Sequence, residues 1–486
     1  MHWFRFLDRM HRLIATASCP KRVLRLFSVK WLRLGVLTLV TPVVLTPFSS
    51  AFAQEWGKKW VASWTAAPHG PYPAAYPVAQ PDLSFALPHG DTQGATNQTF
   101  RLIVKPDLWS NQIRLRFSNT FGTQPVQLGK VAVGLDSYAG NIVVGTSVSV
   151  TFGGKSSVTI PVGKEIYSDA VSLRFADNDM DDDFLKQRLS RNGADAVLVG
   201  RKLAVSFFVS GDSGPMTWHG EAFATSYITP PNSGDHTADI DDLNYPYTTT
   251  SWYLLDAVEV EADEDTAVVC AFGDSITDGV TSTLNGNDRW ADDLSRRLHE
   301  KYGGKISVVN EAISGNTVDS PRSNGTSVNG EPAVDRLDRD VLGIAGLTAL
   351  VWLEGINDLG ASNATPSHVI AGLQNVVQRL HTRGIKVVGC TITSSLNSTI
   401  TSYGTPAVDA GRKVINQFIR TSGIYDSVAD FDAVTVDPST GALLPAFQPN
   451  SSVGGPGDLL HPNRAGYQAM ANAIDLKVLA PNHDLP

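Results

Sequence analysis

The chain has 486 residues, more than a single hydrophobic core usually serves, so its length predicts at least two domains. It holds 39 basic and 48 acidic residues, a formal net charge of −9, and the charge becomes −16 when residues 1–53, with eight basic and one acidic residue, are left out. An acidic chain is not expected to bind nucleic acid or an anionic lipid surface, so a neutral or cationic substrate is favoured. Of its three cysteines only Cys270 and Cys390 lie after residue 53, each in an apolar stretch, so no disulfide framework is implied.

Residues 1–53 have the features of a secretory signal peptide. A basic leader is followed by an apolar stretch, residues 34–45, and by Ala51-Phe52-Ala53, a small-x-small cleavage site before Gln54. A membrane anchor is the alternative, but the apolar stretch is short for a span and contains Pro42. We therefore expect cleavage after residue 53, a secreted or periplasmic location, and no stable membrane insertion of the mature protein.

Residues 54–262 predict an accessory domain of β-sandwich type. Residues 99–104 and 112–117 alternate apolar and polar side chains, the pattern of half-buried strands, and Asn119-Thr120-Phe121-Gly122 supplies a turn. Short strands without intervening helices favour a sandwich. Residues 68–88, rich in Pro, Ala and Tyr, predict an irregular surface loop. Further strands are predicted at 131–133, 142–152, 157–160, 170–175, 203–209 and 252–260.

Two stretches of this region suggest sites of their own. Five aspartates lie between Asp177 and Asp183, but an EF-hand loop starting at Asp177 would need Gly and Glu where Asp182 and Arg188 stand. A solvated loop is therefore favoured over a calcium site. Trp218-His219 is interpreted as a packing pair, with a substrate-side role as the less favoured alternative.

The acidic run 261–265 marks a boundary, and residues 263–486 predict a second domain of different type. Strands and helices alternate there, which is typical of a doubly wound parallel sheet. The helix beginning at Pro366 is well delimited, with Thr365 as its N-cap and Gly384 beyond its end. The predicted strands are 267–272, 307–310, 349–353, 386–391 and 427–431, and the predicted helices are 289–301, 333–342, 366–382, 408–421 and 464–476.

Four separated blocks of this second domain carry residues suited to catalysis. The first is Gly273-Asp274-Ser275, which ends an apolar run typical of a strand buried on both faces. Open α/β sheets build their sites where such strands end. The other blocks contain Gly315 in Asn310–Asn316, Asn357 in Gly355-Ile356-Asn357-Asp358, and His461 three residues after Asp458.

Together the four blocks resemble the GDSL/SGNH hydrolase family, with Ile276 in place of the Leu of the family name. The resemblance covers roughly the last 220 residues. It implies a flavodoxin-like fold for residues 263–486 and ester hydrolysis without a metal or an organic cofactor. Three further features are similar to those of bacterial secreted members with an amino-terminal β-domain. They are a Trp-x-x-Ser-Trp sequence (Trp60 to Trp64) near the start of the β-domain, an Arg-rich strand ending in Ser-Asn-x-Phe-Gly, and Arg289-Trp290.

The residue types agree with acyl transfer. Ser275 Oγ needs a base to take its proton, and His461 is the candidate because imidazole exchanges protons near neutral pH. Asp458, one turn upstream, can orient that ring. The chain order Ser, Asp, His is shared with α/β-hydrolases, but no Gly-x-Ser-x-Gly motif surrounds Ser275.

The resemblance also implies an oxyanion hole formed by the backbone N–H groups of Ser275 and Gly315 and the side-chain amide of Asn357. Three further residues, Asp274, Asp278 and Asp358, are interpreted as supporting the site or its turns. Glu354 and His368 are expected to be ordinary surface or loop positions, and Cys270 and Cys390 to be buried inert thiols.

The function predicted from these residues is a serine esterase acting on a small-molecule or carbohydrate ester. Short-acyl esters are favoured, acetyl groups on polysaccharide among them, because no amphipathic lid helix for a lipid interface is recognised. A lipase or lysophospholipase and an acyltransferase remain alternatives of the same family. A glycan-binding protein with an inactive hydrolase scaffold is the alternative of another class. The β-domain is expected to pack closely on the second domain through residues 252–255 and to shape the substrate mouth.

Overall fold

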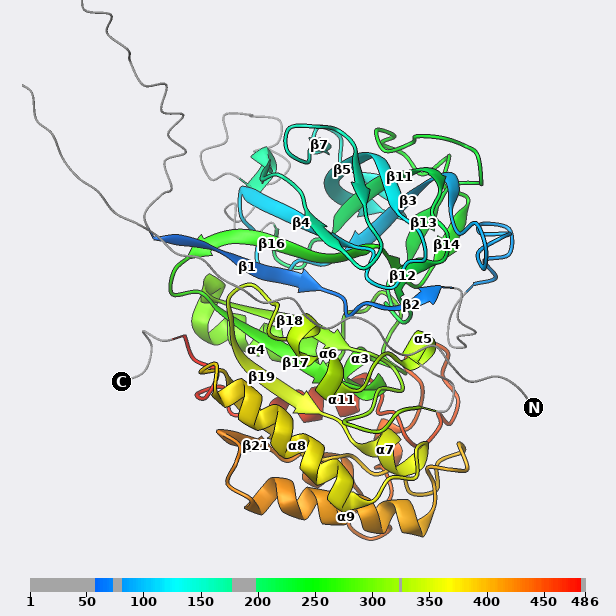
Figure 1. Cartoon of the computed structure of the whole chain (residues 1–486). Helices are drawn as coiled ribbons and strands as arrows, with labels where there is room; N and C mark the ends of the chain where they lie inside the picture. The colour runs from blue at the N-terminus through cyan, green and yellow to red at the C-terminus, as the bar shows by residue number, and fades with distance from the viewer. Residues whose placement is uncertain (1–56, 73–80, 177–197, 323–325, 482–486) are drawn as a thin grey trace, which may run out of the picture. The chain divides into compact units, whose positions relative to one another are not determined.

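The computed structural model describes residues 57–72, 81–176, 198–322 and 326–481 (Figure 1). The predicted signal peptide and the acidic stretch 177–183 lie outside the described residues. Among the described residues no helix is long and apolar enough to cross a membrane.

The second half of the chain contains a five-stranded parallel sheet, as predicted. Its strand order places the first strand of this region between the second and the third, which is the flavodoxin-like order. Each strand pairs in parallel with its neighbour, so the carboxyl ends of the strands meet at one edge. In spatial order the strands are β18 (Ile306–Ala312), β17 (Ala267–Gly273), β19 (Leu347–Leu353), β20 (Lys386–Cys390) and β21 (Ser427–Ala429) (Figure 1).

Strand β17 is buried on both faces, which explains its uninterrupted apolar sequence. Val268, Cys270 and Phe272 belong to one apolar cluster, and the alternate residues Ala267, Val269 and Ala271 belong to another. The first cluster contains side chains of α6 (Ala333–Asp340), α8 (Pro366–His381) and α9 (Pro406–Thr421). The second contains side chains of α4 (Trp290–Tyr302) and α11 (Arg464–Asn472). Helices therefore cover both faces of the sheet.

Helix α8 begins as predicted. The Thr365 side chain accepts a hydrogen bond from the His368 N–H, Pro366 is the first helical residue, and Gly384 beyond the end has a φ of 71°. Helix α9 begins with the same arrangement, Thr405 as the N-cap and Pro406 as the first helical residue. It therefore starts two residues before the predicted position. The remaining helical segments are α3 (Ser275–Asp278), α5 (Thr326–Asn329), α7 (Ile356–Gly360) and α10 (Phe431–Thr435), with 3-10 turns at Arg174–Ala176, Gly303–Lys305 and Pro445–Phe447.

The first half of the described chain forms three antiparallel sheets. The first has the order β1 (Lys58–Thr65), β16 (Leu255–Asp263), β4 (Gln112–Ser118) and β10 (Val171–Ser172), with β9 (Glu165–Tyr167) paired to β4. The second has the order β14 (Tyr247–Thr249), β13 (Ser226–Ile228), β3 (Thr96–Val104), β11 (Leu203–Asp212), β5 (Val126–Tyr138) and β6 (Asn141–Ile142), with β7 (Val148–Val150) and β8 (Val158–Ile160) paired to β5. The third is β15 (Trp252–Tyr253), β12 (Met216–His219) and β2 (His69–Tyr72).

Two of these sheets meet at aromatic side chains. The rings of Phe117 on β4 and Phe207 on β11 lie 5.6 Å apart at an interplanar angle of 80°, a T-shaped contact. A β-sandwich requires two sheets packed against each other, and this ring pair is a contact between two sheets. That residues 54–262 form a separate sandwich domain stays a prediction.

Several strand predictions in this half need correction. The strand predicted at 142–152 is divided into β6 and β7, and the one predicted at 252–260 is interrupted at Leu254, whose φ is 61°. Residues 170–175 form a two-residue strand and a 3-10 turn, and the loop predicted from residue 68 contains β2. Strands β1, β9, β12, β13 and β14 were not predicted, since most are short and find their partners far away in sequence.

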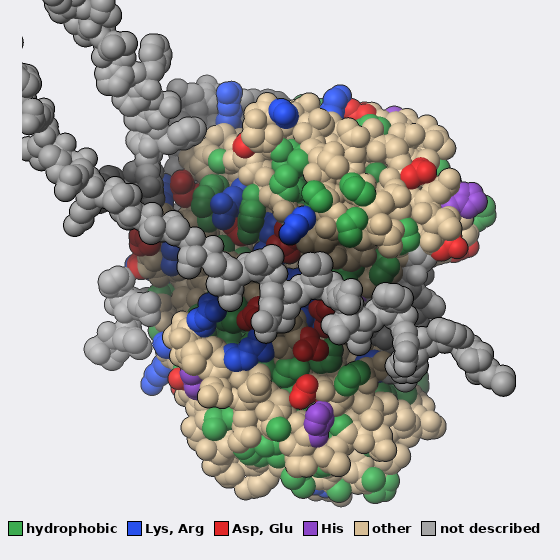
Figure 2. All heavy atoms as spheres, viewed as in Figure 1, with side chains coloured by type: hydrophobic (Ala, Val, Ile, Leu, Met, Phe, Trp, Pro, Cys, Tyr) green, Lys and Arg blue, Asp and Glu red, His purple; other side chains and the backbone are tan. Residues whose placement is uncertain are grey.

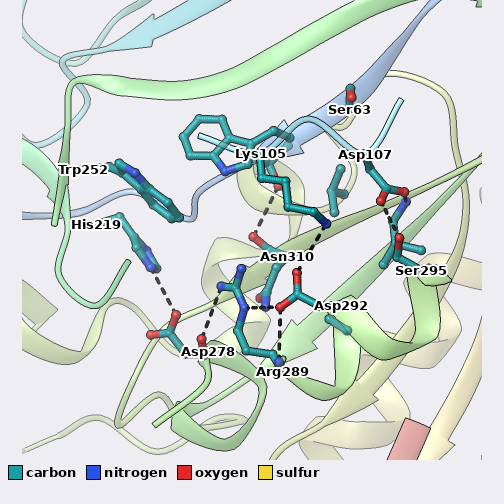
Figure 3. A pocket seen from close by; sticks show the side chains of 15 residues that line it. Ser63, Lys105, Asp107, His219, Trp252, Asp278, Arg289, Asp292, Ser295 and Asn310 are labelled. Atoms are coloured by element: carbon teal, nitrogen blue, oxygen red, sulfur yellow. Dashed lines mark hydrogen bonds and ion pairs between the residues drawn. The ribbon is translucent and has the colours of Figure 1, made fainter. Parts of the chain in front are cut away.

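The β-sheets contact the parallel sheet along β1 and β18 (Figure 1). Ser307 Oγ on β18 donates to the Ala62 carbonyl at 2.8 Å, and the Ala62 N–H donates to the Ala345 carbonyl at 2.9 Å. A polar cavity of about 40 Å³ lies between the two parts, lined in part by Asp107, His219 and Arg289 (Figure 3). The cavity has room for water molecules.

Asp107 makes several polar contacts between the two parts. Its carboxylate accepts from Ser295 Oγ at 2.5 Å and from the Val308 N–H at 2.6 Å, and it lies 3.0 Å from His299 Nε2. A loop of the β-sheet region therefore holds both α4 and β18.

Asp107→Ala should lower the free energy of unfolding by about 2–4 kcal/mol, because it leaves the Val308 N–H and the Ser295 hydroxyl without their acceptor. Urea unfolding followed by tryptophan fluorescence measures the change. Asp91→Ala, at an exposed turn position, is the control and should change the stability by less than about 0.5 kcal/mol. Equal stability of the two variants would show that Asp107 does not join the two parts energetically.

Candidate active site

Ser275 lies at the carboxyl edge of the parallel sheet. Strand β17 ends at Gly273, which pairs with Ala312 on β18 and Leu353 on β19, and α3 starts at Ser275. A Cβ on Gly273 would lie 2.1 Å from the Leu353 carbonyl oxygen, so only glycine permits this approach of the strands. The Asp274 side chain caps α3 by accepting from the Ile276 N–H at 3.0 Å.

The structure brings Ser275, His461 and Asp458 into one hydrogen-bonded chain. His461 Nε2 lies 2.8 Å from Ser275 Oγ, and His461 Nδ1 lies 2.5 Å from Asp458 Oδ2. The other carboxylate oxygen of Asp458 accepts from the backbone N–H groups of Leu460 and His461, both at 2.9 Å. Burial raises the pKa of Asp458, but the His461 ring and these N–H donors outweigh it and hold the pKa well below its ordinary value. Asp458 is thus an ionised acceptor at neutral pH.

The His461 loop is tied to the segment that follows Ser275. Thr281 Oγ1 donates to the Pro462 carbonyl at 2.6 Å, and Tyr467 Oη donates to the Val280 carbonyl at 2.6 Å. Asn463 caps α11 by accepting from the N–H groups of Ala465 and Gly466. These bonds explain how residues almost 190 positions apart keep one geometry.

Gly315 lies in a backbone conformation that favours glycine, with a φ of 79°. A Cβ there would lie 2.1 Å from Asn329 Nδ2, so a side chain would displace the amide that donates to the Ser314 carbonyl at 3.0 Å. Among the described residues none accepts a hydrogen bond from the N–H of Ser275 or of Gly315. Both N–H groups are therefore available to a ligand.

The amide of Asn357 has a defined orientation. Its Nδ2 donates to the Asn316 carbonyl at 2.8 Å, which places Asn357 beside the Gly315 segment. Its Oδ1 accepts from Tyr403 Oη at 2.7 Å and from an Arg322 guanidinium nitrogen at 3.4 Å. Because Oδ1 is occupied and Nδ2 carries two hydrogens, one N–H remains for a ligand.

Arg336 on α6 joins the Ser275 and Gly315 segments. Its side chain is fully buried and donates to the carbonyls of Gly273 at 3.2 Å and Glu311 at 2.7 Å, and to Asn316 Oδ1 at 2.8 Å. Sequence reasoning missed this residue together with Tyr403 and Arg322. A polar residue on the buried face of a predicted helix was the only available signal for Arg336.

The three aspartates interpreted as supporting the site accept backbone hydrogen bonds around it. Asp274 and Asp358 accept backbone N–H groups at the starts of α3 and of the Val318 segment, and Asp278 accepts from the Ser314 N–H. Glu354, expected at a surface or loop position, lies in the loop between β19 and α7, but it is buried there, and Trp352 Nε1 donates to it at 2.8 Å. It follows the buried strand β19, and the parallel sheet carries it inward. His368 is exposed on α8, as expected.

Cys270 and Cys390 are free and buried in β17 and β20, as predicted, and burial raises the pKa of both thiols. Within the described part of the chain no group of three His, Cys, Asp or Glu side chains has a metal-binding arrangement.

The five-stranded parallel sheet thus carries the hydrogen-bonded chain of Ser275, His461 and Asp458 at its carboxyl edge. Residues 271–469 match the model of the GDSL-like Lipase/Acylhydrolase family, and the match contains Ser275, Gly315, Asn357, Asp458 and His461. The chain thus carries a GDSL-like lipase/acylhydrolase domain.

Solved structures of similar proteins come from several bacteria. An aryl esterase of M. smegmatis is 17% identical, with 44% of this chain and 100% of that chain covered and a TM-score of 0.35. A carbohydrate acetylesterase of Sinorhizobium meliloti is 16% identical, with 44% and 98% covered and a TM-score of 0.34. A GDSL-like lipase of Bacteroides thetaiotaomicron is 16% identical, with 44% and 88% covered and a TM-score of 0.32. No curated protein matches the chain.

The buried Glu354 predicts a pH dependence of stability. Burial raises the pKa of Glu354 to about 8, above its value of 4.5 in an unfolded chain. Between these pH values the folded state holds a proton that the unfolded state has lost, so the contribution of Glu354 to stability is full below pH 4.5 and is lost as the pH rises to 8. Glu354→Gln should reduce the fall in unfolding free energy between pH 5 and pH 8 by about 1–3 kcal/mol.

Urea unfolding at the two pH values measures this difference, with Glu264→Gln in an exposed turn as the control that should follow the wild type. An unchanged pH slope in Glu354→Gln would contradict the prediction.

Proposed function

We propose that this protein is an exported serine esterase that hydrolyses short-acyl carboxylic esters through an acyl-enzyme. The observation that carries the proposal is the hydrogen-bonded chain Ser275–His461–Asp458 beside three available N–H donors at the carboxyl edge of the sheet. The family match supports a hydrolase domain. The export is proposed on the signal-like sequence of residues 1–53.

In this mechanism Ser275 Oγ attacks the ester carbonyl carbon while its proton passes to His461 Nε2. Asp458 accepts from His461 Nδ1–H and stabilises the imidazolium that forms. The N–H groups of Ser275 and Gly315 and the free amide N–H of Asn357 donate to the oxyanion. His461 then protonates the leaving alcohol, and the acyl group stays on Ser275 Oγ. Water attacks this acyl-enzyme with His461 again as the base, and the carboxylic acid leaves.

The proposed substrate is a neutral small-molecule or carbohydrate ester, with acetylated polysaccharide as the first polymer to test. The formal charge of −16 for residues 54–486 disfavours anionic polymers. On the face seen in Figure 2, basic and acidic side chains are interspersed over the described residues without an extended basic block, which supports a partner other than nucleic acid. No metal or organic cofactor is part of the proposed reaction.

Ser275→Ala and His461→Ala should each lower kcat by about 10⁴–10⁶-fold, because both take part in one proton-coupled attack, and the double variant should be little worse than either. Asp458→Ala should be milder. The assay uses p-nitrophenyl esters of increasing acyl length and acetylated xylan, with and without an acceptor alcohol. Ser367→Ala, at an exposed position, is the control.

Near-normal turnover in Ser275→Ala would overturn the proposal. Transfer of the acyl group to the added alcohol in preference to water would identify an acyltransferase instead of a hydrolase.

Asn357→Ala should lower kcat by about 10²–10³-fold with KM roughly unchanged, because its amide meets a charge that exists only in the transition state. Asn357→Asp should be worse, since it sets a carboxylate against the oxyanion. Steady-state kinetics on p-nitrophenyl acetate distinguish the two parameters, with the exposed Asn472→Ala as the control. A raised KM with kcat intact would make Asn357 a substrate-binding group.

A further inference from the structure

Asp278, the last residue of α3, lies one helical turn after Ser275 and is buried. Its Oδ2 accepts from the Ser314 N–H at 3.0 Å and lies 2.9 Å from Ser314 Oγ. The short helix that starts with the nucleophile thus holds the residue immediately before Gly315.

Both peptide groups that flank Ser314 are held by side chains, and the Ser314 carbonyl belongs to the peptide that carries the Gly315 N–H. The Ser314 N–H is held by Asp278, and the Ser314 carbonyl accepts from Asn329 Nδ2 at 3.0 Å. A trans peptide is planar, so its N–H points opposite to its C=O. Holding the Ser314 carbonyl therefore sets the direction of the Gly315 N–H, which is the proposed oxyanion donor.

Two side chains of the β-sheet region contact Asp278 and Ser314. Glu221 follows β12, is buried, and its Oε2 lies 2.5 Å from Ser314 Oγ. His219, the last residue of β12, has its Nε2 3.1 Å from Asp278 Oδ1 and its Nδ1 3.0 Å from the Ala67 carbonyl. Figure 3 shows the His219 ring directed at Asp278, with Trp252 beside it and Arg289 on the other side of Asp278. The rings of His219 and Trp252 stack at 5.5 Å.

The contacts of Ser314 Oγ restrict where the protons lie. Its single hydrogen cannot serve two ionised carboxylates at once. Burial and the charge of Asp278 raise the pKa of Glu221 to about 8, so Glu221 is protonated at neutral pH. Glu221 then donates to Ser314 Oγ, and Ser314 Oγ donates to Asp278 Oδ2. The second oxygen of Glu221 is buried and has no partner among the described residues, a position that suits a neutral carboxylic acid better than a carboxylate.

We propose that Glu221 and His219 are positioning residues of the esterase site: they hold Asp278 and Ser314 so that the Gly315 N–H faces the oxyanion. Both lie outside residues 271–469, the part matched by the family model. The β-sheet region therefore completes the oxyanion side of a site whose reacting groups all come from the other half of the chain. This inference rests on the proposed esterase function.

The test compares Glu221→Leu, Glu221→Gln and Ser314→Ala in the full-length protein with p-nitrophenyl acetate. A fluorophosphonate probe labels the nucleophile to completion, so that kcat is expressed per labelled site and unfolded protein does not count. Glu221→Leu and Ser314→Ala should lower kcat by about 10–100-fold with KM within about threefold of wild type, because an oxyanion donor acts in the transition state. Glu221→Gln should keep kcat within about threefold, since its amide also donates to Ser314 Oγ.

Glu259→Gln is the matched control, because Glu259 is a buried glutamate of β16 that pairs with Arg114. It should leave kcat per labelled site unchanged. Wild-type kcat per labelled site in Ser314→Ala, or a Glu221→Gln variant as impaired as Glu221→Leu, would overturn the inference. Absence of ester hydrolysis by the wild type would instead overturn the proposed function itself.

Discussion

The geometry of the site depends on the hydrogen bonds that the buried guanidinium of Arg336 donates. It donates hydrogen bonds to Gly273 at the end of β17, to Glu311 near the end of β18, and to Asn316 in the segment after β18. Its charge is balanced by Asp340 at 3.2 Å, and it lies over the Phe272 ring at 4.1 Å. Hydrogen bonds to a charged group each contribute about 1.5–3 kcal/mol, and only the planar fork of arginine reaches three acceptors in different directions. This side chain therefore holds the Ser275 and Gly315 segments together, in addition to the hydrogen bonds between Asp278 and Ser314.

The carboxyl groups around the site differ in environment, and the environment sets what each can do. Burial raises the pKa of Asp274 to about 7 and those of Glu221 and Glu354 to about 8. Asp458, by contrast, receives backbone N–H groups and the His461 ring and stays ionised. Protonated buried acids can donate hydrogen bonds, whereas Asp458 can only accept them. Asp274, Glu221 and Glu354, with raised pKa values, therefore differ from Asp458, the ionised carboxylate that contacts the His461 ring.

How far the sequence predicted this protein depends on how local each signal is. All five strands of the parallel sheet and the helices α4, α6, α8, α9 and α11 were predicted within a few residues, because apolar runs and caps such as Thr365 depend on neighbouring residues. The β-sheet region was predicted less completely. Strands as short as β2 and β12 exist because partners distant in sequence supply their hydrogen bonds, and the sequence pattern of three or four residues carries little of that information.

For the candidate site, the sequence by itself determined the chemically distinctive residues: Ser275, Gly315, Asn357, Asp458 and His461 stand in motifs whose spacing is readable along the chain. Only the tertiary structure decided which other side chains support them. Arg336, Tyr403 and Glu221 belong to no motif, and His219 was interpreted first as a packing partner of Trp218. Each of these four acts through contacts with residues distant in sequence. The same holds for Glu354, whose burial follows from the packing of the parallel sheet and not from its own neighbours. Hydrogen bonds depend on distance and direction in space, and a linear sequence specifies neither until the chain has folded.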